Sequence, residues 1–180
     1  NFDFMAEHYF DNVGIISGGM FYKNIDNFIY GLANNQELTV NGTTDTYDVT
    51  QPFNGGSAKV YGFELAFQRK LDFLPSFLKN LTFYGNYTYT NSETDGVVGR
   101  EDGLELAGAV PNTLNGSLAY ETKKLSVRLS LNYADDYIDE YGDDTFEDRY
   151  YDSQLFLDFN ASYAITKNLR IFGEMKNITN

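Results

Sequence analysis

The sequence contains no cysteine and only one histidine, His8. Without cysteine there can be no disulfide and no thiolate metal site. A single histidine excludes zinc sites built on histidine pairs and leaves little room for a Ser-His-Asp triad. Acidic residues outnumber basic ones by 26 to 13, which disfavours nucleic acid as a partner because phosphates are bound by lysine and arginine. We therefore expect no catalytic residue, no cofactor, no metal ion and no nucleic acid.

Long apolar runs are also missing. No stretch approaches the roughly 18 apolar residues of a membrane-spanning helix, and residues 1–10 lack the basic start and apolar run of a signal peptide. Aromatic residues nevertheless make up 17% of the chain, a share that argues against disorder. So many aromatic side chains at a mean hydropathy of −0.40 indicate amphipathic strands.

Apolar and polar residues alternate strictly in four segments, which are residues 81–90, 113–121, 125–133 and 154–164. One face of each segment is entirely apolar or glycine and the other is mostly polar, as in a strand with one apolar side. A helical face through Leu155 would instead include Asp158 and Ser162, which have no reason to be buried. Weaker alternation brings the expected strands to about eight, adding residues 2–7, 13–32, 61–68 and 169–176.

The connections between these segments alternate in length. Short connections are expected at Asp11–Asn12, Asp72–Lys79, Thr122–Lys124 and Thr166–Asn168. Long polar loops are expected at Ala33–Ala58, Asn91–Val110 and Asp135–Arg149. Alternating short turns and long loops are typical of outer-membrane barrels, and strands of about ten residues are long enough to cross a bilayer at a tilt. The pattern predicts an all-β fold, an antiparallel up-and-down transmembrane β-barrel segment.

The apolar faces of the four best segments carry no charge, as a lipid-facing surface requires. We assign seven residues to the lipid side: Leu81, Phe83, Leu118, Leu129, Leu131, Leu157 and Phe159. Aromatic residues flank both ends of the strands, with Tyr133 and Tyr137 near a long loop and Phe73 and Phe77 by a short turn. Such rings suit the membrane interface. Acidic residues gather in the long loops and basic residues at the short turns.

Five segments, taken in order, resemble strands of TonB-dependent receptor barrels. They are GGMFYKNIDNFI at 18–29, VYGFEL at 60–65, LTFYGNYTYT at 81–90, VPNTLN at 110–115 and LRIFGEMKNITN at 169–180. The resemblance implies about eight strands of a barrel of about 22 strands, with the plug domain and the final strand outside residues 1–180. Because both ends fall inside alternating segments, we expect the chain to be part of a longer barrel.

The resemblance also implies a function. Such receptors lie in the bacterial outer membrane and import a scarce nutrient, here a ferric siderophore, haem, cobalamin or an oligosaccharide. The implied partners are outer-membrane lipid, the protein's own plug domain, the TonB–ExbB–ExbD complex and a small-molecule ligand. Residues expected to face the lumen and the plug are Thr88, Asn115, Arg128, Asn132, Asp158 and Asn160. Ligand contacts are expected in the third long loop, from Tyr137, Asp139, Tyr141, Tyr150 and Tyr151.

Two other interpretations stay open. Eight strands are enough to close a small structural or adhesive barrel without transport, and a soluble extracellular β-protein such as a carbohydrate-binding module would also use amphipathic strands. The acidic run from Asp135 to Asp148 lacks the spacing of an EF-hand loop, which favours a solvated loop over a calcium site. Glu101, Asp102 and Glu105 have no partner nucleophile, so we do not expect an enzyme.

Overall fold

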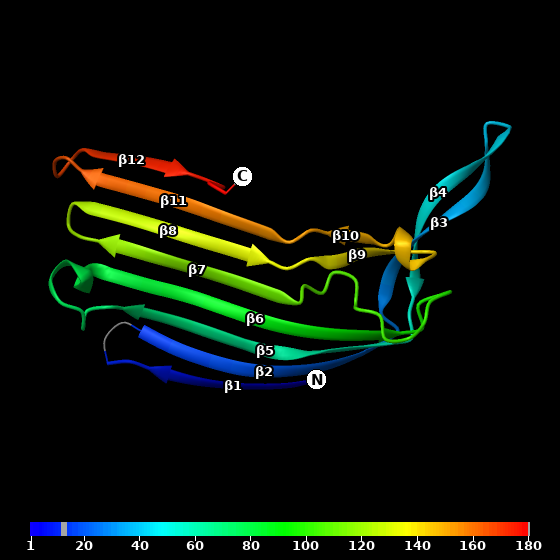
Figure 1. Cartoon of the computed structure of the whole chain (residues 1–180), viewed down its shortest axis with the longest axis horizontal. Helices are drawn as coiled ribbons and strands as arrows, with labels where there is room; N and C mark the ends of the chain where they lie inside the picture. The colour runs from blue at the N-terminus through cyan, green and yellow to red at the C-terminus, as the bar shows by residue number, and fades with distance from the viewer. Residues whose placement is uncertain (12–13, 180) are drawn as a thin grey trace.

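The protein is built mainly from antiparallel strands, in a computed structural model that describes residues 1–11 and 14–179. Eight strands form one sheet in the order β1-β2-β5-β6-β7-β8-β11-β12 (Figure 1). Their bounds are β1 Phe2–Tyr9, β2 Gly14–Asp26, β5 Ser57–Lys70, β6 Leu81–Asp95, β7 Asn112–Glu121, β8 Leu125–Ala134, β11 Gln154–Ala164 and β12 Arg170–Met175. The expected all-β meander is therefore confirmed. Among the described residues, no helix has the length and apolarity to span a bilayer.

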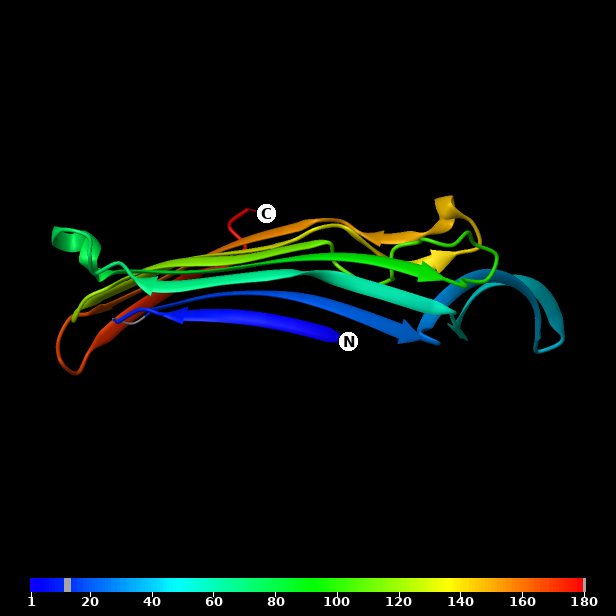
Figure 2. The ribbon, with the colours of Figure 1, turned by 90° about the horizontal axis from the view of Figure 1, so that it is seen from below.

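The sheet is open rather than closed on itself. In the described residues β1 and β12 occupy opposite edges and each pairs with a single neighbour. A complete eight-stranded barrel would need these two strands to pair, so the small closed barrel considered from the sequence is not what the chain forms. Edge-on, the sheet is arched (Figure 2), the shape of a section of a larger barrel wall.

The short turns and the long connections lie at opposite ends of the sheet (Figure 1). The predicted turn at Thr122–Lys124 is closed by a hydrogen bond from the Thr122 N–H to the Leu125 carbonyl (2.7 Å). The predicted turn at 166–168 is closed in the same way by Leu169, whose carbonyl accepts from the Ile165 N–H (2.9 Å). The connection at 72–79 holds a short 3-10 helix, η1 (Ser76–Asn80). Asn12, in the remaining predicted turn, and Val13 lie outside the described residues, as does Asn180.

Two of the long connections are themselves structured, which corrects the expectation of plain polar loops. They contribute a second sheet of order β10-β9-β3-β4, formed by β3 (Ile29–Val40), β4 (Thr43–Asn54), β9 (Tyr137–Gly142) and β10 (Arg149–Tyr151). A further 3-10 helix, η2, covers Thr145–Glu147. The connection at 33–58 is thus mostly the hairpin β3–β4, which projects beyond the main sheet (Figure 1).

The hairpin has a local cause in the sequence. Its turn is Asn41-Gly42, with φ of 53° and 81°, and this dipeptide is the strongest short signal for a two-residue hairpin turn. Asn27 is also left-handed (φ 55°), and it lies between the end of β2 and the start of β3. Residues 13–32 therefore do not form the single strand expected from their composition, because the chain changes direction at Asn27.

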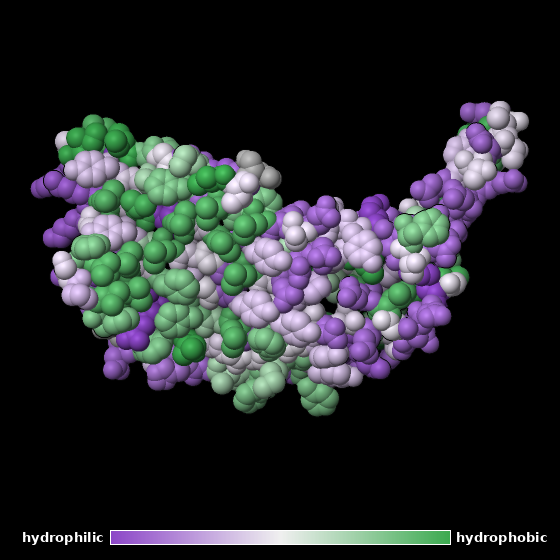
Figure 3. Space-filling model, in the orientation of Figure 1, coloured by the Kyte–Doolittle hydropathy of each residue, from purple (hydrophilic) through white to green (hydrophobic). Residues whose placement is uncertain are grey.

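The two faces of the main sheet match the predicted alternation. Phe83, Leu118, Leu129 and Phe159 lie directly opposite one another on four successive strands. The next row of the same face contains Leu131 paired with Leu157, and Leu81 lies on this face at the start of β6. Figure 3 shows apolar residues over the part of the sheet that leads to the short turns, and mostly polar residues towards the long connections. The residues assigned to lipid therefore share one face.

The opposite face carries the predicted lumen residues, again in rows. Asn86, Asn115 and Asn132 lie opposite one another across β6, β7 and β8, and the Asn115 side chain donates to the Asn86 side chain (2.9 Å). The remaining four fall on the same face, with Thr88 opposite Thr113, Arg128 opposite Asn160, and Asp158 opposite Ser130.

Candidate functional site: a packed loop end above the sheet

The best-packed part of the described chain is the loop end. A cluster of buried side chains joins β3, β9 and the connection after β6, and it contains Phe28, Tyr30, Leu32, Ala58, Val97, Ile138 and Tyr141. Few of the described residues of the main sheet are buried outside this cluster. The loops are therefore a small folded unit with its own apolar core, held against the end of the strands.

Aromatic rings form the centre of this cluster. The Tyr30 ring lies 5.6 Å from that of Phe28 and 5.6 Å from that of Tyr141. The Tyr30 hydroxyl accepts a hydrogen bond from the Val98 N–H (2.8 Å), which ties the second long connection to the first. Buried tyrosines commonly satisfy their hydroxyl in this way while the ring fills the core.

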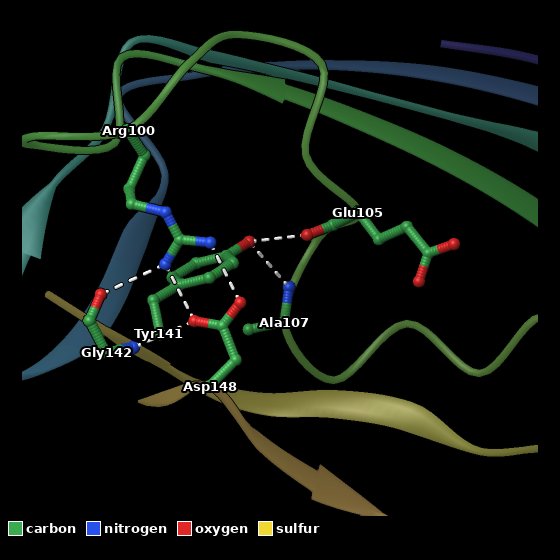
Figure 4. A network of polar contacts seen from close by, with 6 residues as sticks. All are labelled: Arg100, Glu105, Ala107, Tyr141, Gly142 and Asp148. Carbon is green, nitrogen blue, oxygen red and sulfur yellow. Dashed lines mark hydrogen bonds and ion pairs between the residues drawn. The ribbon is translucent and has the colours of Figure 1, made fainter. Parts of the chain in front are cut away.

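Tyr141 connects β9 to the same connection (Figure 4). Its hydroxyl donates to the Glu105 carbonyl (2.6 Å) and accepts from the Ala107 N–H (2.9 Å). Its relative exposure is 0%, and burial raises the pKa of the phenol above its ordinary value. The sequence placed Tyr141 among the ligand contacts, but in this arrangement the side chain has no surface to offer a ligand. Its ring belongs to the buried cluster beside Tyr30, so Tyr141 is a packing residue.

A buried ion pair closes the other side of the unit. Arg100 donates two parallel hydrogen bonds to the Asp148 carboxylate, at 2.7 and 2.8 Å, and both side chains are almost fully buried, at 4% and 3% exposure. Arg100 also donates to the Gly142 carbonyl (3.0 Å), and the Gly142 N–H donates to Asp148 (2.9 Å). Two loops that are 48 residues apart in sequence are thereby joined (Figure 4).

Electrostatics favour the charged form of both partners. Burial alone would raise the pKa of the Asp148 carboxyl, but hydrogen bonds from Arg100 and from the Gly142 N–H outweigh it and leave the pKa below its usual value. The hydrogen bond to Asp148 raises the pKa of Arg100. The sequence predicts Asp148 as part of a solvated acidic loop and gives no role to Arg100. Neither segment carries a local signal that the two side chains pair.

Gly142 allows the close approach that this ion pair requires. A Cβ at this position would lie 2.7 Å from the backbone carbon of Glu147 and 2.8 Å from its oxygen. The end of η2 can therefore fold onto β9 only because residue 142 has no side chain.

The other predicted ligand contacts are more accessible but do not share one face, because Tyr151 lies opposite Tyr137 whereas Tyr150 lies opposite the buried Ile138. The rings of Tyr137 and Tyr151 stack at 5.3 Å. Arg149 bridges Asp139 (2.5 Å) and Glu140 (2.7 Å) beside them. Tyr150 and Tyr151 are half-exposed. The structure thus brings Tyr137, Asp139 and Tyr151 to one exposed patch and adds Arg149, which sequence reasoning had treated only as the end of a loop.

The acidic residues of this loop do not gather into a metal site. Among the described residues, no three acidic or histidine side chains are arranged to hold an ion. Several of the acids are instead used in the contacts above, namely Asp139, Glu140 and Asp148.

Comparison with known proteins identifies the barrel. The family model of the TonB dependent receptor-like β-barrel matches residues 1–178 of the chain. The chain belongs to this family of TonB-dependent receptors. No protein of curated function matches it by sequence. The family is one of outer-membrane transport receptors and not of enzymes, and its barrel accounts for the open arched sheet.

Solved structures agree on the fold of this TonB-dependent receptor segment. A mutant of the ferric enterobactin receptor of Pseudomonas aeruginosa superposes with a TM-score of 0.61 at 18% identity, covering 98% of this chain and 25% of that one. The siderophore receptor PirA of Acinetobacter baumannii gives a TM-score of 0.59 at 14% identity, covering 94% and 26%. The chain thus spans about a quarter of the length of these receptors.

Proposed function

We propose that this segment belongs to a receptor that imports a ferric siderophore across the bacterial outer membrane with energy supplied through TonB. Membership of the TonB-dependent receptor family is the observation that carries the proposal. The two structural relatives described above are named as receptors for ferric enterobactin and for a siderophore. In this proposal the eight main strands are barrel wall, and β3–β4, the 96–111 connection and β9–β10 are the outer loops.

The exposed patch on β9 and β10 is the proposed ligand contact. Tyr137 and Tyr151 offer a stacked aromatic surface, beside which the Arg149 guanidinium is already bound to the carboxylates of Asp139 and Glu140. Asp139 completes the patch, and Tyr150, on the other face of β10 opposite Ile138, is proposed to contact the ligand separately. The stacked aromatic rings suit an iron chelator that itself carries rings. Because the buried Tyr30–Tyr141 cluster holds these loops in place, the patch is formed before ligand arrives, which lowers the entropic cost of binding.

The polar face is proposed to contact the plug domain. Its rows of Asn115 with Asn132 and Arg128 with Asn160 present hydrogen-bonding groups towards the lumen, as do Thr88 and Asp158. Ligand bound in the outer loops would then be released to the periplasm by plug rearrangement driven by TonB–ExbB–ExbD.

The test is uptake of radioactive iron by cells that carry the intact receptor. A deletion strain and a strain lacking TonB should both lose siderophore-dependent iron uptake, and the intact gene should restore it. Haem, cobalamin and oligosaccharide uptake are measured in parallel. If the deletion strain loses uptake of one of these compounds and keeps siderophore uptake, that compound is the ligand. Full uptake in the strain without TonB would refute the mechanism.

A matched pair of variants tests the patch. Tyr151→Ala removes a half-exposed ring of the stacked pair, and we expect siderophore affinity to fall about tenfold, the loss typical of an aromatic contact residue. Tyr163→Ala removes a tyrosine of similar exposure (43% against 48%) on the lipid-facing row of β11. Its affinity should match that of the wild type. Equal losses in both variants would assign the effect to barrel assembly.

A further inference from the structure

A second feature, at the opposite end of the sheet, concerns the membrane. Arg69 lies on the apolar face, in the row that contains Phe83, Leu118 and Leu129, close to the end of β5. Arg69 is the charged residue at the turn end of the alternating series of β5 that places apolar side chains on this face. An arginine at mid-bilayer would cost about 2–4 kcal/mol, but near the interface the cost falls to about 0–1 kcal/mol, so its place at the turn end is tolerated.

The Arg69 guanidinium is held between two aromatic rings. Its central carbon lies 4.3 Å from the Phe10 ring centroid and 4.8 Å from that of Phe73. Gly14, opposite Arg69 on β2, leaves room for the stem, since a Cβ there would lie 3.1 Å from the Arg69 Cγ. The conformation of the Arg69 side chain is therefore fixed by these contacts.

The Arg69 guanidinium keeps hydrogen-bonding capacity for a ligand. Arg69 takes part in none of the ion pairs of the described residues. Its Nε atom is buried and has no hydrogen-bond partner among them. The guanidinium is therefore held by its contacts with the aromatic rings and not by an ion pair.

The surroundings are those of a membrane interface. Phe10 contacts His8 and Phe67, at ring-centroid distances of 5.0 and 6.2 Å, and these rings share the lipid-facing side. Phe73 and Phe77 extend from the turn with 62% and 63% exposure, and η1 lies in the short connection that follows the end of β5, where Arg69 lies. The bases Lys79, Lys123, Lys124 and Lys167 also lie at this turn end.

We propose that Arg69 binds the phosphate of an anionic phospholipid in the periplasmic leaflet, with Phe10 and Phe73 against its glycerol and acyl region. A phosphate diester supplies acceptor oxygens for the guanidinium, and planar arginine binds phosphate through paired hydrogen bonds. The lipid is favoured over free phosphate because the site opens onto an apolar face lined by exposed rings. The inference rests on placement of the barrel in the outer membrane and not on the identity of the imported ligand.

Native mass spectrometry of the intact receptor in neutral detergent tests the site. Wild type should bind phosphatidylglycerol about fivefold more tightly than phosphatidylcholine, the effect of one basic residue near an anionic headgroup. Arg69→Gln should abolish that preference. Arg170→Gln, which changes an arginine at the same end but on the polar face beside Ser162, should keep it. Absence of preference in wild type, or the same loss in both variants, would overturn the proposal.

Two further experiments distinguish a bound lipid from free phosphate and from lipid bound elsewhere on the barrel. Millimolar inorganic phosphate should not displace the bound phosphatidylglycerol, and displacement would mean a site for free phosphate and refute the lipid assignment. Phosphatidylglycerol with a photoreactive headgroup should label residues 69–79 of the wild-type receptor. This experiment does not depend on the folding of a variant. Labelling elsewhere on the barrel would exclude Arg69 as the site. Receptors that fail to transport siderophore but keep this labelling would separate the inference from the proposed function.

Discussion

Replacing Arg100 with methionine should loosen the outer loops while leaving the barrel intact. The variant removes three hydrogen bonds, two to Asp148 and one to the Gly142 carbonyl, and leaves a carboxylate with 3% exposure. Removing one partner of a buried pair costs about 3–5 kcal/mol. Since about 1.4 kcal/mol is a factor of ten, local opening should become on the order of 100-fold more frequent or higher.

Hydrogen exchange measures this opening directly, because protected amides exchange through local unfolding. The amides of Val98, Ala107 and Gly142 donate within the loop unit, so their exchange should accelerate in Arg100→Met while that of β7 and β8 stays unchanged. Arg128→Met is the control, because its ion pair with Glu121 is long (3.9 Å) and half-exposed, and such pairs contribute about 0–1 kcal/mol.

A double variant, Arg100→Met with Asp148→Leu, completes the test. It removes the uncompensated charge, and apolar replacement of a buried pair is often neutral, so protection should largely return. If the single variant exchanges no faster than Arg128→Met, the ion pair does not hold the loops and the reasoning is refuted.

Three further predictions concern the wall and the loops. Leu129→Arg should block barrel assembly, since a charge on the lipid face costs about 2–4 kcal/mol, whereas Asn132→Ala on the other face should assemble normally; gel mobility of unheated protein decides, and normal assembly of both would contradict the face assignment. Tyr141→Phe leaves the Ala107 N–H without its buried acceptor and should cost about 1–3 kcal/mol, seen as faster exchange of that amide. The pKa of the Asp148 carboxyl is lowered in the folded loops, so its charge stabilises them fully above about pH 4, near the pKa of an unfolded aspartate. This stabilisation is lost as the pH falls through the lower folded pKa. Hydrogen exchange of the loop amides, corrected for its intrinsic pH dependence, should therefore not change between neutral pH and about pH 5.

The strands and their faces were open to prediction because the cause is local. Leu129 and Leu131 face one side and Ser130 and Asn132 the other through the pleat of one strand, whatever that strand pairs with. The Asn41-Gly42 turn is equally local, although the polar composition of residues 33–58 by itself favoured a loop over a hairpin. Family resemblance, carried by several segments in order, then supplied what alternation alone could not, namely the kind of barrel.

By itself, then, the sequence determined the period of the strands, the apolar face, most turn positions and the receptor family. Only the tertiary structure decided which loop residues are buried. Tyr141 and Tyr150 lie in the same aromatic and acidic stretch, yet one is fully buried and the other half-exposed. The pairing of Arg100 with Asp148 and the placement of Arg69 between Phe10 and Phe73 also join residues from separate segments. Such contacts depend on how distant segments meet in space, and no periodicity within a single segment records them.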